Sequence, residues 1–292
     1  MIPSPIPLAT EDAGAYTLLP VSSFEECRDL LQSFSDDPVF SDPMLSTEEQ
    51  RNKNLKQAIA QPERHLVMQV WRGQRPVGLF AFLELAEERY LEMLVGLSRE
   101  PALHQRILQE LSRRYPAYTA DFVFNPANFA LKEALTQVGA AFDPEQQTMV
   151  LRQPVLAADT TGVVLLSPEY EAAYYAMHNT DLYWTGEKVA AASDRFRVLL
   201  ALDGNRVVGY LDVTYGFEEN EPYDLFVLPA YRRRGHARRM LSQALAMNQP
   251  KGMMLLVDVD NEAAIRLYEA AGFATVPGRG SLTAHWSVPA EE

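Results

Sequence analysis

The sequence predicts a mixed α/β protein in which one fold occurs twice in tandem. Two pairs of similar segments support this prediction. Residues 72–78 resemble residues 203–209 at an offset of 131, and residues 128–139 resemble residues 261–272 at an offset of 133. The matches keep their order at nearly the same offset, and the period is too long for a solenoid repeat. A length of 292 residues also suits two domains.

The composition indicates a globular protein and argues against several classes of function. Hydrophobic residues make up 47% of the chain, which is enough to build real cores. The formal net charge is −13, and such a field repels a phosphate backbone, so no nucleic-acid partner is expected. The single cysteine, Cys27, excludes an internal disulfide and a cysteine-rich metal site. The five histidines lack metal-ligand spacing, so no metal is expected.

The N-terminal residues lack the charged and apolar regions of a signal peptide. No apolar run approaches the roughly 20 residues that a membrane helix needs. We therefore expect a cytoplasmic protein, either a monomer or a homodimer, without a membrane partner.

Each half contains the same predicted elements. A short turn with glycine separates two β-rich runs, which predicts a β-hairpin. Further along, a strand-like run precedes a helix that begins at an asparagine and ends at a glycine, both favourable caps. These caps are Asn128 and Gly139 in the first half, and Asn261 and Gly272 in the second.

The second half can be divided into elements in chain order. We expect strands at 163–166, 195–202, 206–215, 222–228 and 253–259, helices at 168–178, 184–192, 235–248 and 262–271, a loop at 216–221 and strand residues at 273–287. A linker is expected near 153–162, where turn-forming residues gather. We therefore place one domain at 1–155 and the other at 163–292, each with helices packed against a sheet.

The most informative stretch is residues 225–240, where a strand passes through a proline turn and a basic loop opens a helix. The first turn of a helix has free backbone N–H groups and a partial positive charge, so it binds anions. Gly235 lacks the Cβ that would block close approach, and Ala237 is small. Five arginines lie here in an otherwise acidic chain: Arg232, Arg233, Arg234, Arg238 and Arg239. The pattern predicts a polyphosphate site, and a solvated basic helix start is the alternative.

Two motifs in the second half resemble those of the GNAT superfamily of N-acetyltransferases. The first resembles its acetyl-CoA signature, R/Q-x-x-G-x-G/A, and comprises Val227, Pro229, Arg232, Gly235 and Ala237. The second comprises Asn261, Ala264, Tyr268, Gly272 and Phe273. The order and separation of the two match the superfamily, and the resemblance covers about residues 163–287. It implies two GNAT-like domains in tandem, each with a central, mostly antiparallel sheet flanked by helices, and acetyl-CoA as the co-substrate.

The resemblance also implies how the co-substrate is held. The loop would bind the pyrophosphate of coenzyme A through main-chain N–H groups of Arg232, Arg233, Arg234, Gly235, His236 and Ala237. The strand that contains Leu225, Phe226 and Val227 would splay from residues 253–259 and leave main-chain groups free. The N–H of Leu225 or Phe226 would face the thioester oxygen, where developing charge needs a donor. Asn261 would contact the pantetheine arm.

Two side chains are candidate catalytic residues. The resemblance implies that Tyr268 protonates the departing thiolate, which suits a phenol that stays protonated at neutral pH. A core aromatic is the alternative. Glu221 lies six positions before Val227, where several members carry the base that deprotonates the amine. An ordinary loop charge is the alternative, and Asp224 and Asp212 are reserve candidates.

Strand alternation would place Glu221, Tyr223 and Leu225 on one face of their strand and Asp224 on the other. The acceptor pocket of this fold is usually walled by its first two helices. In this chain that region holds Tyr174, Tyr175, Tyr183 and Trp184. Aromatic faces near carboxylates could bind an ammonium group, whereas core packing is the alternative. We therefore expect Tyr183, Trp184 and Asp224 to contact the acceptor.

The first half departs from the pattern. Its strand-to-helix junction, residues 96–104, has no glycine after an arginine cluster, and Pro101 lacks an N–H where donors are needed. Leu135 stands in the position of Tyr268. We infer a degenerate GNAT-like domain without coenzyme A binding, which braces the second domain or closes one side of the acceptor cleft.

The expected function is acetyl-CoA-dependent N-acetylation of a primary amine, most plausibly that of a small molecule. Direct attack of the amine in a ternary complex needs no covalent enzyme intermediate, so no serine, threonine or cysteine nucleophile is required. Two alternatives stay open. The acceptor could be the N-terminus or a lysine of a protein, which suits an acidic face, or the chain could be a coenzyme A-binding regulatory module without transfer activity.

Overall fold

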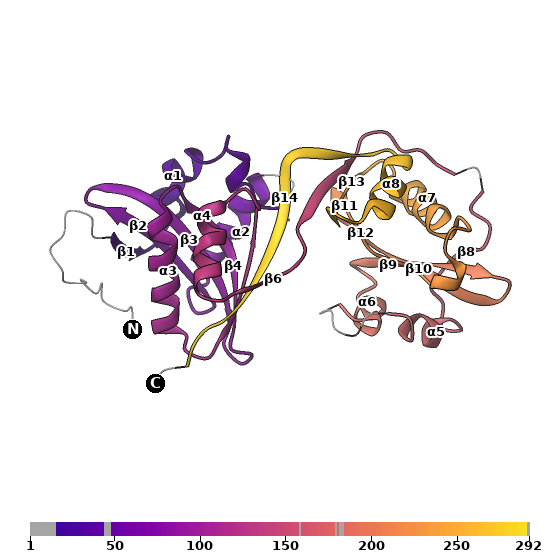
Figure 1. The fold of residues 1–292 in the computed structure, drawn as a ribbon, viewed down its shortest axis with the longest axis horizontal. Coiled ribbons are helices and arrows are strands. Elements are labelled where there is room, and N and C mark those ends of the chain that lie inside the picture. Colours follow the sequence, from indigo (N-terminus) through magenta and orange to yellow (C-terminus); the bar gives the residue numbers. More distant parts are fainter. Residues whose placement is uncertain (1–15, 44–47, 158, 179, 181–183, 291–292) are drawn as a thin grey trace. The chain divides into compact units, whose positions relative to one another are not determined.

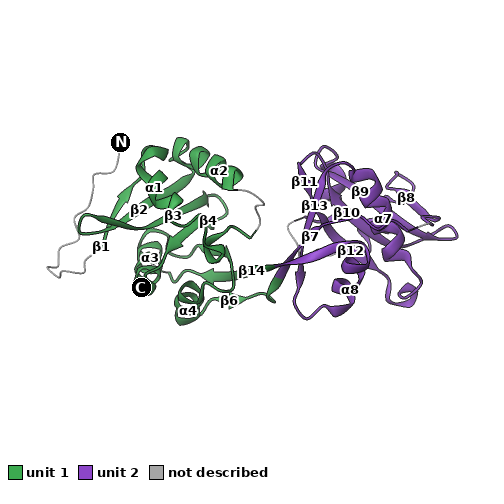
Figure 2. Ribbon diagram, turned by 90° about the horizontal axis from the view of Figure 1, so that it is seen from above, with its two compact units in different colours: residues 1–146, 277–292 green, residues 147–276 purple. Residues whose placement is uncertain are grey.

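The computed structural model describes residues 16–43, 48–157, 159–178, 180 and 184–290. The chain forms two compact units (Figure 2). Unit 1 comprises residues 1–146 and 277–292, and unit 2 comprises residues 147–276. This division differs from the expected boundaries, because the C-terminal residues belong to unit 1 and the segment expected as a linker belongs to unit 2. Within the described residues, no helix is long and apolar enough to cross a membrane.

Unit 1 is a sheet with helices on both faces. Its strands are β1 (Tyr16–Pro20), β2 (His65–Arg72), β3 (Arg75–Leu85), β4 (Tyr90–Ser98), β5 (Thr119–Phe124) and β6 (Ala141–Phe142). One face is covered by α3 (Pro101–Arg114) and α4 (Phe129–Gln137), and the other by η1 (Phe24–Cys27), α1 (Arg28–Gln32) and α2 (Glu48–Ala60), while η2 (Pro38–Phe40) lies between α1 and α2 in the chain. In α3 the buried residues Leu103, Ile107 and Leu111 recur every four positions, which gives the helix its apolar stripe.

Unit 2 has the same layered plan. Its elements are β7 (Gln146–Leu151), β8 (Val163–Leu165), α5 (Glu171–Tyr175), α6 (Gly186–Ala191), β9 (Phe196–Asp203), β10 (Arg206–Thr214), β11 (Glu219–Asn220), β12 (Pro222–Val227), η3 (Pro229–Tyr231), α7 (His236–Asn248), β13 (Gly252–Asp258), α8 (Glu262–Ala270) and the start of β14 (Phe273–Ser287). One sheet has the order β12-β10-β9-β8, and β13 lies between β7 and β11. Helices α7 and α8 cover one face of the four-stranded sheet, and α5 and α6 the other (Figure 1).

All the strands and helices expected in the second half are present. Two details differ. Helix α5 ends at Tyr175, short of the expected boundary, because the chain turns at Ala176 and Met177. The expected loop before β12 contains β11, whose Glu219 pairs with Gly252 in a parallel register. A strand of two residues has too short a pattern to be recognised in a sequence.

The repeat is visible in irregularities of the strand pairing. Val77 on β3 has no partner of its own on β2, and Val208 on β10 has none on β9, so each is an extra residue in its strand pair. Leu94 on β4 and Tyr223 on β12 are likewise extra residues opposite β3 and β10. A β-bulge is a specific feature of a fold, so its occurrence at matching positions supports the internal duplication.

The last strands of the two halves are exchanged. Residues 282–287 of β14, which follow the elements of unit 2 in the chain, pair with β5 and β6 of unit 1. Strand β7 follows the elements of unit 1 but lies beside β13 of unit 2. Each unit therefore completes its sheet with a strand from the other half of the sequence.

Candidate active site

The site in unit 2 is built where β12 and β13 come into contact without pairing. Strand β12 is the edge of the four-stranded sheet, and β13 belongs to a different set of paired strands. The N–H of Leu228 donates to the carbonyl oxygen of Val208 on β10 at 2.9 Å. Because main-chain groups alternate along a strand, those of Val227 and Leu225 point away from β10. Of the two residues expected to offer an N–H to the thioester, this geometry favours Leu225 over Phe226.

The carbonyl of Val227 supports this orientation. Its oxygen accepts a hydrogen bond from Nε of Arg232 at 3.0 Å. The first arginine of the basic loop is thereby folded back onto the end of β12. Arg234 is also held, since its Nη2 donates to the carbonyl of Ala230 at 3.1 Å and its Nη1 lies 3.7 Å from Asp203. The loop is tied at both of these arginines.

The loop has the backbone geometry of an anion site. Gly235 is the N-cap of α7 with φ +82°, and Arg233 also has a positive φ of 63°. A Cβ at Gly235 would meet no atom within 4 Å, so the space beside it is open. The first N–H groups of α7, beginning at His236, have no acceptor inside the helix. Successive N–H groups in such a turn form a concave anion-binding nest, which fits the pyrophosphate of coenzyme A.

Three other residues expected at the co-substrate also have structural roles. His236 is buried, and burial together with Arg239 lowers the pKa of its ring, so the imidazole is neutral at pH 7. Asn261 caps α8, with its Oδ1 accepting from the N–H of Ala264 at 3.1 Å. Ala237 packs against the core under α7. The exposed part of the loop is therefore 232–235.

The position of Tyr268 on α8 is compatible with both roles considered for it, a core aromatic and a proton donor. Its ring is part of the core and meets Phe273 edge-on, with 5.8 Å between the ring centroids. Burial, with the nearby carboxylates of Glu221 and Asp224, raises the pKa of the hydroxyl to about 12. The phenol is therefore protonated throughout the neutral range and available as a proton donor.

Glu221 lies at the start of β12, beside β10 and β13. Its N–H donates to Oγ1 of Thr214 at 2.7 Å, and its carbonyl accepts from the N–H of Thr214 at 2.9 Å. Burial raises the pKa of the carboxyl to about 7, although the N–H of Leu256 on β13 and the positive charge of Arg195 act to lower it. A carboxyl that titrates near neutrality is well matched to general base catalysis.

The expected alternation along β12 is wrong at Tyr223. The ring of Tyr223 packs 5.8 Å from Phe196 under α5 and α6, whereas Leu225 packs in the core under α7 and α8. The cause is the β-bulge, since Asp212 pairs with Asp224 but Val213 pairs with Pro222, which leaves Tyr223 as the extra residue. A bulge is not visible in a period-two pattern.

A buried polar network lies on the other side of β12 and β10. Asp212 is 0% exposed; its Oδ1 accepts from the hydroxyl of Tyr174 at 2.8 Å and its Oδ2 lies 2.9 Å from Nε2 of His178. Oδ2 of Asp224 accepts from the hydroxyl of Tyr210 at 2.8 Å and lies 3.8 Å from the same His178 nitrogen. We call these five residues the aspartate–histidine network.

The network was only partly anticipated. Asp212 and Asp224 were reserve candidates for the base, but Asp212 has no exposed surface through which an acceptor could reach it. His178 and Tyr210 were missed. The sequence offered one signal for the network: Tyr210 and Asp212 are two positions apart in a largely apolar strand, so their polar groups lie on the same face. The ring and carboxylate atoms of His178, Asp212 and Asp224 lie within 4.8 Å of one another, and they are engaged in the contacts above as a polar network.

Two aromatic residues, Tyr183 and Trp184, were expected to contact the acceptor, and only Trp184 is among the described residues. Tyr183 lies outside the described residues. Trp184 packs against Phe196 with ring centroids 5.0 Å apart, and the guanidinium of Arg195 lies 4.9 Å from its ring. Trp184 thus belongs to the layer next to β9, at the same edge as Tyr223.

In the described part of unit 1, the start of α3 differs from the start of α7. The N-cap of α3, in the place of Gly235, is Glu100, and Pro101 follows it. The Glu100 carboxylate pairs with Arg72 at 2.9 Å and accepts from the hydroxyl of Tyr16 at 2.8 Å. An internal acid therefore stands at this helix N-terminus and would repel a phosphate. Leu135, which replaces Tyr268, is 0% exposed.

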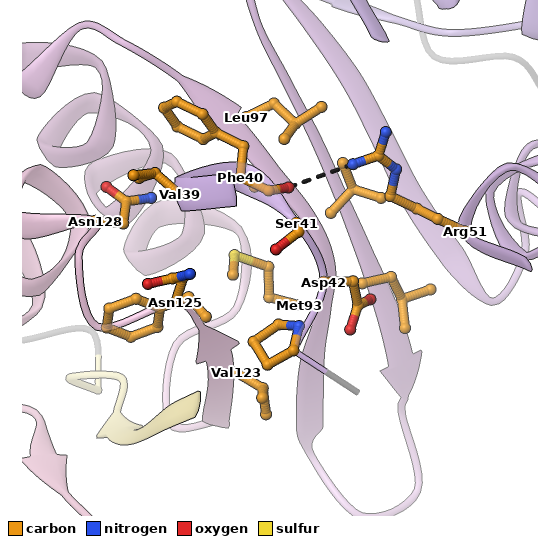
Figure 3. Close-up of a pocket in the computed structure, with 15 residues that line it drawn as sticks. Val39, Phe40, Ser41, Asp42, Arg51, Met93, Leu97, Val123, Asn125 and Asn128 are labelled. Atoms are coloured by element: carbon orange, nitrogen blue, oxygen red, sulfur yellow. Dashed lines mark hydrogen bonds between the residues drawn. The ribbon is translucent and has the colours of Figure 1, made fainter. Parts of the chain in front are cut away.

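A small pocket in unit 1 lies where β4 and β5 diverge (Figure 3). The two strands pair only from Tyr90 to Met93, and the cavity beyond them has a volume of about 30 Å³. Residues after η2 line it, and Nδ2 of Asn125 holds η2 in place through the carbonyl of Pro38 at 2.9 Å. The buried Arg51 donates to the carbonyl of Phe40 at 3.3 Å. In unit 1, β4 and β5 thus diverge after Met93, and residues of the segment after η2 fill most of the space between them.

The comparisons with known proteins concern the same regions. Residues 163–273 match the model described as the acetyltransferase (GNAT) family. A search of curated proteins found no match to the sequence. Similar solved structures include a GCN5-related N-acetyltransferase from Sphaerobacter thermophilus, with 13% identity, a TM-score of 0.64 and coverage of 97% of this chain and 99% of that one.

Two further structures extend the comparison. A tandem GNAT protein from the clavulanic acid biosynthesis pathway has 12% identity and a TM-score of 0.56, covering 95% of this chain and 100% of that one. The glucosamine N-acetyltransferase region of a fungal GH3 β-N-acetylglucosaminidase has 12% identity and a TM-score of 0.61, covering 94% of this chain and 38% of that one. At this identity the likeness shows the fold, and it confirms the predicted tandem arrangement.

Proposed function

We propose that this tandem GNAT-fold protein is an acetyl-CoA-dependent N-acetyltransferase that acts on the primary amine of a small molecule. The observation that supports it most is that two buried proton-handling groups, Glu221 and Tyr268, lie near each other in unit 2. Burial raises the pKa of the Glu221 carboxyl to about 7, and burial together with the Glu221 carboxylate raises the pKa of the Tyr268 hydroxyl to about 12. Bound acetyl-CoA would supply the activated acyl group.

The residues of unit 2 have separate roles in this proposal. The nest formed by residues 232–237 binds the pyrophosphate, and Asn261 contacts the pantetheine arm. The N–H of Leu225 stabilises negative charge on the carbonyl oxygen. The Glu221 carboxylate accepts a proton from the acceptor ammonium, and Oη of Tyr268 holds the proton that the leaving sulfur requires. The amine attacks directly, so no side chain forms a covalent bond.

Calorimetric binding of acetyl-CoA tests the co-substrate site. The wild type should bind one molecule per chain, and Gly235→Glu, which gives α7 the acidic N-cap of α3, should not bind. Gly73→Glu in unit 1 is the matched control, because Gly73 also has a positive φ, of 61°, and open space around it. This variant should bind like the wild type.

The outcomes separate the alternatives. No binding by the wild type would refute the proposal, and two sites per chain would refute the assignment of a silent unit 1. If the wild type binds acetyl-CoA but releases no coenzyme A thiol in the presence of any amine, a coenzyme A-binding regulatory module would be favoured. Release with basic peptides but not with free amines would favour a protein or peptide acetyltransferase.

A further inference from the structure

We infer that Asp224 captures the acceptor as its ammonium ion, and that His178, which Asp212 holds in place, is the positioning residue that keeps this carboxylate oriented. The inference deepens the proposed function and rests on it. It gives two neighbouring acids different roles, capture for Asp224 on β12 and deprotonation for Glu221 just before that strand. The substrate class is a primary amine that is protonated at neutral pH.

The carboxylate of Asp224 is fixed on one side and open on the other. Its Oδ2 is held by the hydroxyl of Tyr210 at 2.8 Å, with Nε2 of His178 at 3.8 Å. Within the described part of the chain, its Oδ1 accepts no hydrogen bond. The side chain keeps 25% exposure, whereas those of Asp212 and His178 keep 0% and 1%. Asp224 is thus the member of the network that a ligand can reach.

The ring of His178 is held from several directions. It stacks on Tyr210 with centroids 5.0 Å apart and planes 15° apart, and it meets Tyr174 edge-on at 5.4 Å. A Cβ on Gly186 would come within 3.1 Å of its Cβ, so α6 also approaches it closely. With so little freedom, the Nε2 of this ring must remain between the two aspartates.

The charges of the network leave one negative charge facing outward. A fully buried carboxylate such as Asp212 is costly unless it is paired. Burial raises its pKa, whereas the hydrogen bonds from His178 and Tyr174 act to lower it, and we infer that His178 pairs with it as an imidazolium. Among the described residues, the titratable groups around the ring include Tyr174 on α5, Glu187 on α6, Tyr210 and Asp212 on β10, and Asp224 on β12. Once Asp212 is neutralised, the charge of Asp224 is left for a cation at the exposed oxygen.

This arrangement gives the acceptor an order of events. The ammonium ion binds first to Oδ1 of Asp224 as an intact cation. Its proton then passes to the carboxylate of Glu221, just before β12, which lies opposite Thr214 of β10 as Asp224 lies opposite Asp212. Burial raises the pKa of this carboxyl to about 7. The neutral amine that remains is the nucleophile. The proton and charge balance, since one cation enters and one carboxylate is neutralised.

The test compares ammonium ions with alcohols of the same shape. Binding to the protein saturated with coenzyme A is measured by calorimetry for a series from methylammonium to benzylammonium, each paired with its alcohol. The wild type should bind at least one ammonium ion more tightly than its alcohol. Asp224→Asn and His178→Gln should each weaken that ion about tenfold or more, without changing coenzyme A binding or alcohol binding.

His285→Gln is the matched control. His285 in unit 1 also bridges two aspartates, with Asp121 at 2.7 Å and Asp143 at 3.1 Å. This variant should leave the binding of the ammonium ion unchanged. An equal loss for coenzyme A and alcohol in His178→Gln would assign the histidine a structural role only, and no preference for any ammonium ion in the wild type would overturn the inference.

A second measurement does not depend on any variant. Long-range ¹H–¹⁵N spectra of the wild type should show the ring of His178 as an imidazolium at pH 7, and a neutral ring would overturn the inference. A divalent cation that copurifies with the wild type and is lost from Asp212→Asn would also overturn it. Failure of coenzyme A itself to bind would instead refute the proposed function.

Discussion

At the scale of single residues, the site depends on how similar acids are placed in different surroundings. Glu221 and Asp224 are three positions apart, yet one titrates near neutrality and the other is held by Tyr210 and His178. The sequence motif identified Glu221 and Tyr268 through their spacing. It could not predict their ionisation, because burial between β12 and β13 depends on strands that are distant in sequence.

The pKa of Glu221 predicts a pH-dependent rate. Because burial raises this pKa from its usual value of 4.5 to about 7, the base is protonated at lower pH. With a saturating amine, kcat should rise with pH and level off above about 7. Glu221→Gln should lower kcat by about 10²–10⁴ and remove this limb of the profile.

Two controls accompany the Glu221 variant. Glu92 of β4 occupies the matching position beside the bulge, so Glu92→Gln should leave the profile unchanged. The folded protein binds the Glu221 proton more tightly than the unfolded chain does. As the pH rises from about 4.5 to 7, the free energy of unfolding of the wild type should therefore fall relative to that of Glu221→Gln. A variant that keeps the full pH profile would contradict the assignment of the base.

Removing one hydroxyl tests the proton donor. Tyr268→Phe keeps the ring against Phe273 but loses the proton, so kcat should fall by about 10²–10⁴ while the Kd of acetyl-CoA stays the same. Tyr90→Phe removes a buried hydroxyl that donates to Asp121 at 3.0 Å in unit 1, and its kcat should be that of the wild type. Wild-type turnover in Tyr268→Phe would exclude the acid role.

At the scale of elements, local signals were the most reliable. Asn128 and Asn261 cap α4 and α8 as expected, because a cap needs only the residue and the turn that follows it. The hairpins and the basic loop before α7 were also predicted from local patterns. The bulge at Tyr223 and the position of His178 were not, since both depend on pairing and packing with distant residues.

The two C-terminal glycines of these helices should differ in their tolerance of a side chain. A Cβ at Gly272 would lie 1.7 Å from the carbonyl oxygen of Gln153, and its φ is +98°. Gly272→Ala should therefore lower the free energy of unfolding by about 3 kcal/mol or more. At Gly139, with φ +76° and no atom within 4 Å of a Cβ, alanine should cost only about 1–2 kcal/mol. Urea denaturation measures both, and equal losses would contradict the packing argument.

At the scale of the whole molecule, the exchange of strands decides which residues form a unit. The sequence predicted the duplication, because two segments recur at a nearly constant offset. It could not predict the exchange, since the local pattern of a strand does not specify its partner. The boundary expected near 153–162 follows the repeat, whereas the units follow the pairing of β7 with β13 and of β14 with β5.

Two fragments distinguish these boundaries. Residues 147–276 contain every strand of unit 2, so this fragment should fold and bind acetyl-CoA. Residues 163–292 lack β7 and carry the part of β14 that unit 1 requires, so this fragment should aggregate or remain unfolded. Circular dichroism and calorimetry provide the comparison, and folding of the second fragment alone would show that the exchanged strands are dispensable.

The exchanged strands also affect the order of events while the chain is being synthesised. N-terminal domains usually fold first as they leave the ribosome. In this protein the edge of β5 has to wait for residues 282–287, which are synthesised after all the residues of unit 2. Until then unit 1 has an unpaired strand edge, which is a template for aggregation. The sheet of unit 1 can therefore be completed only after unit 2 has been synthesised.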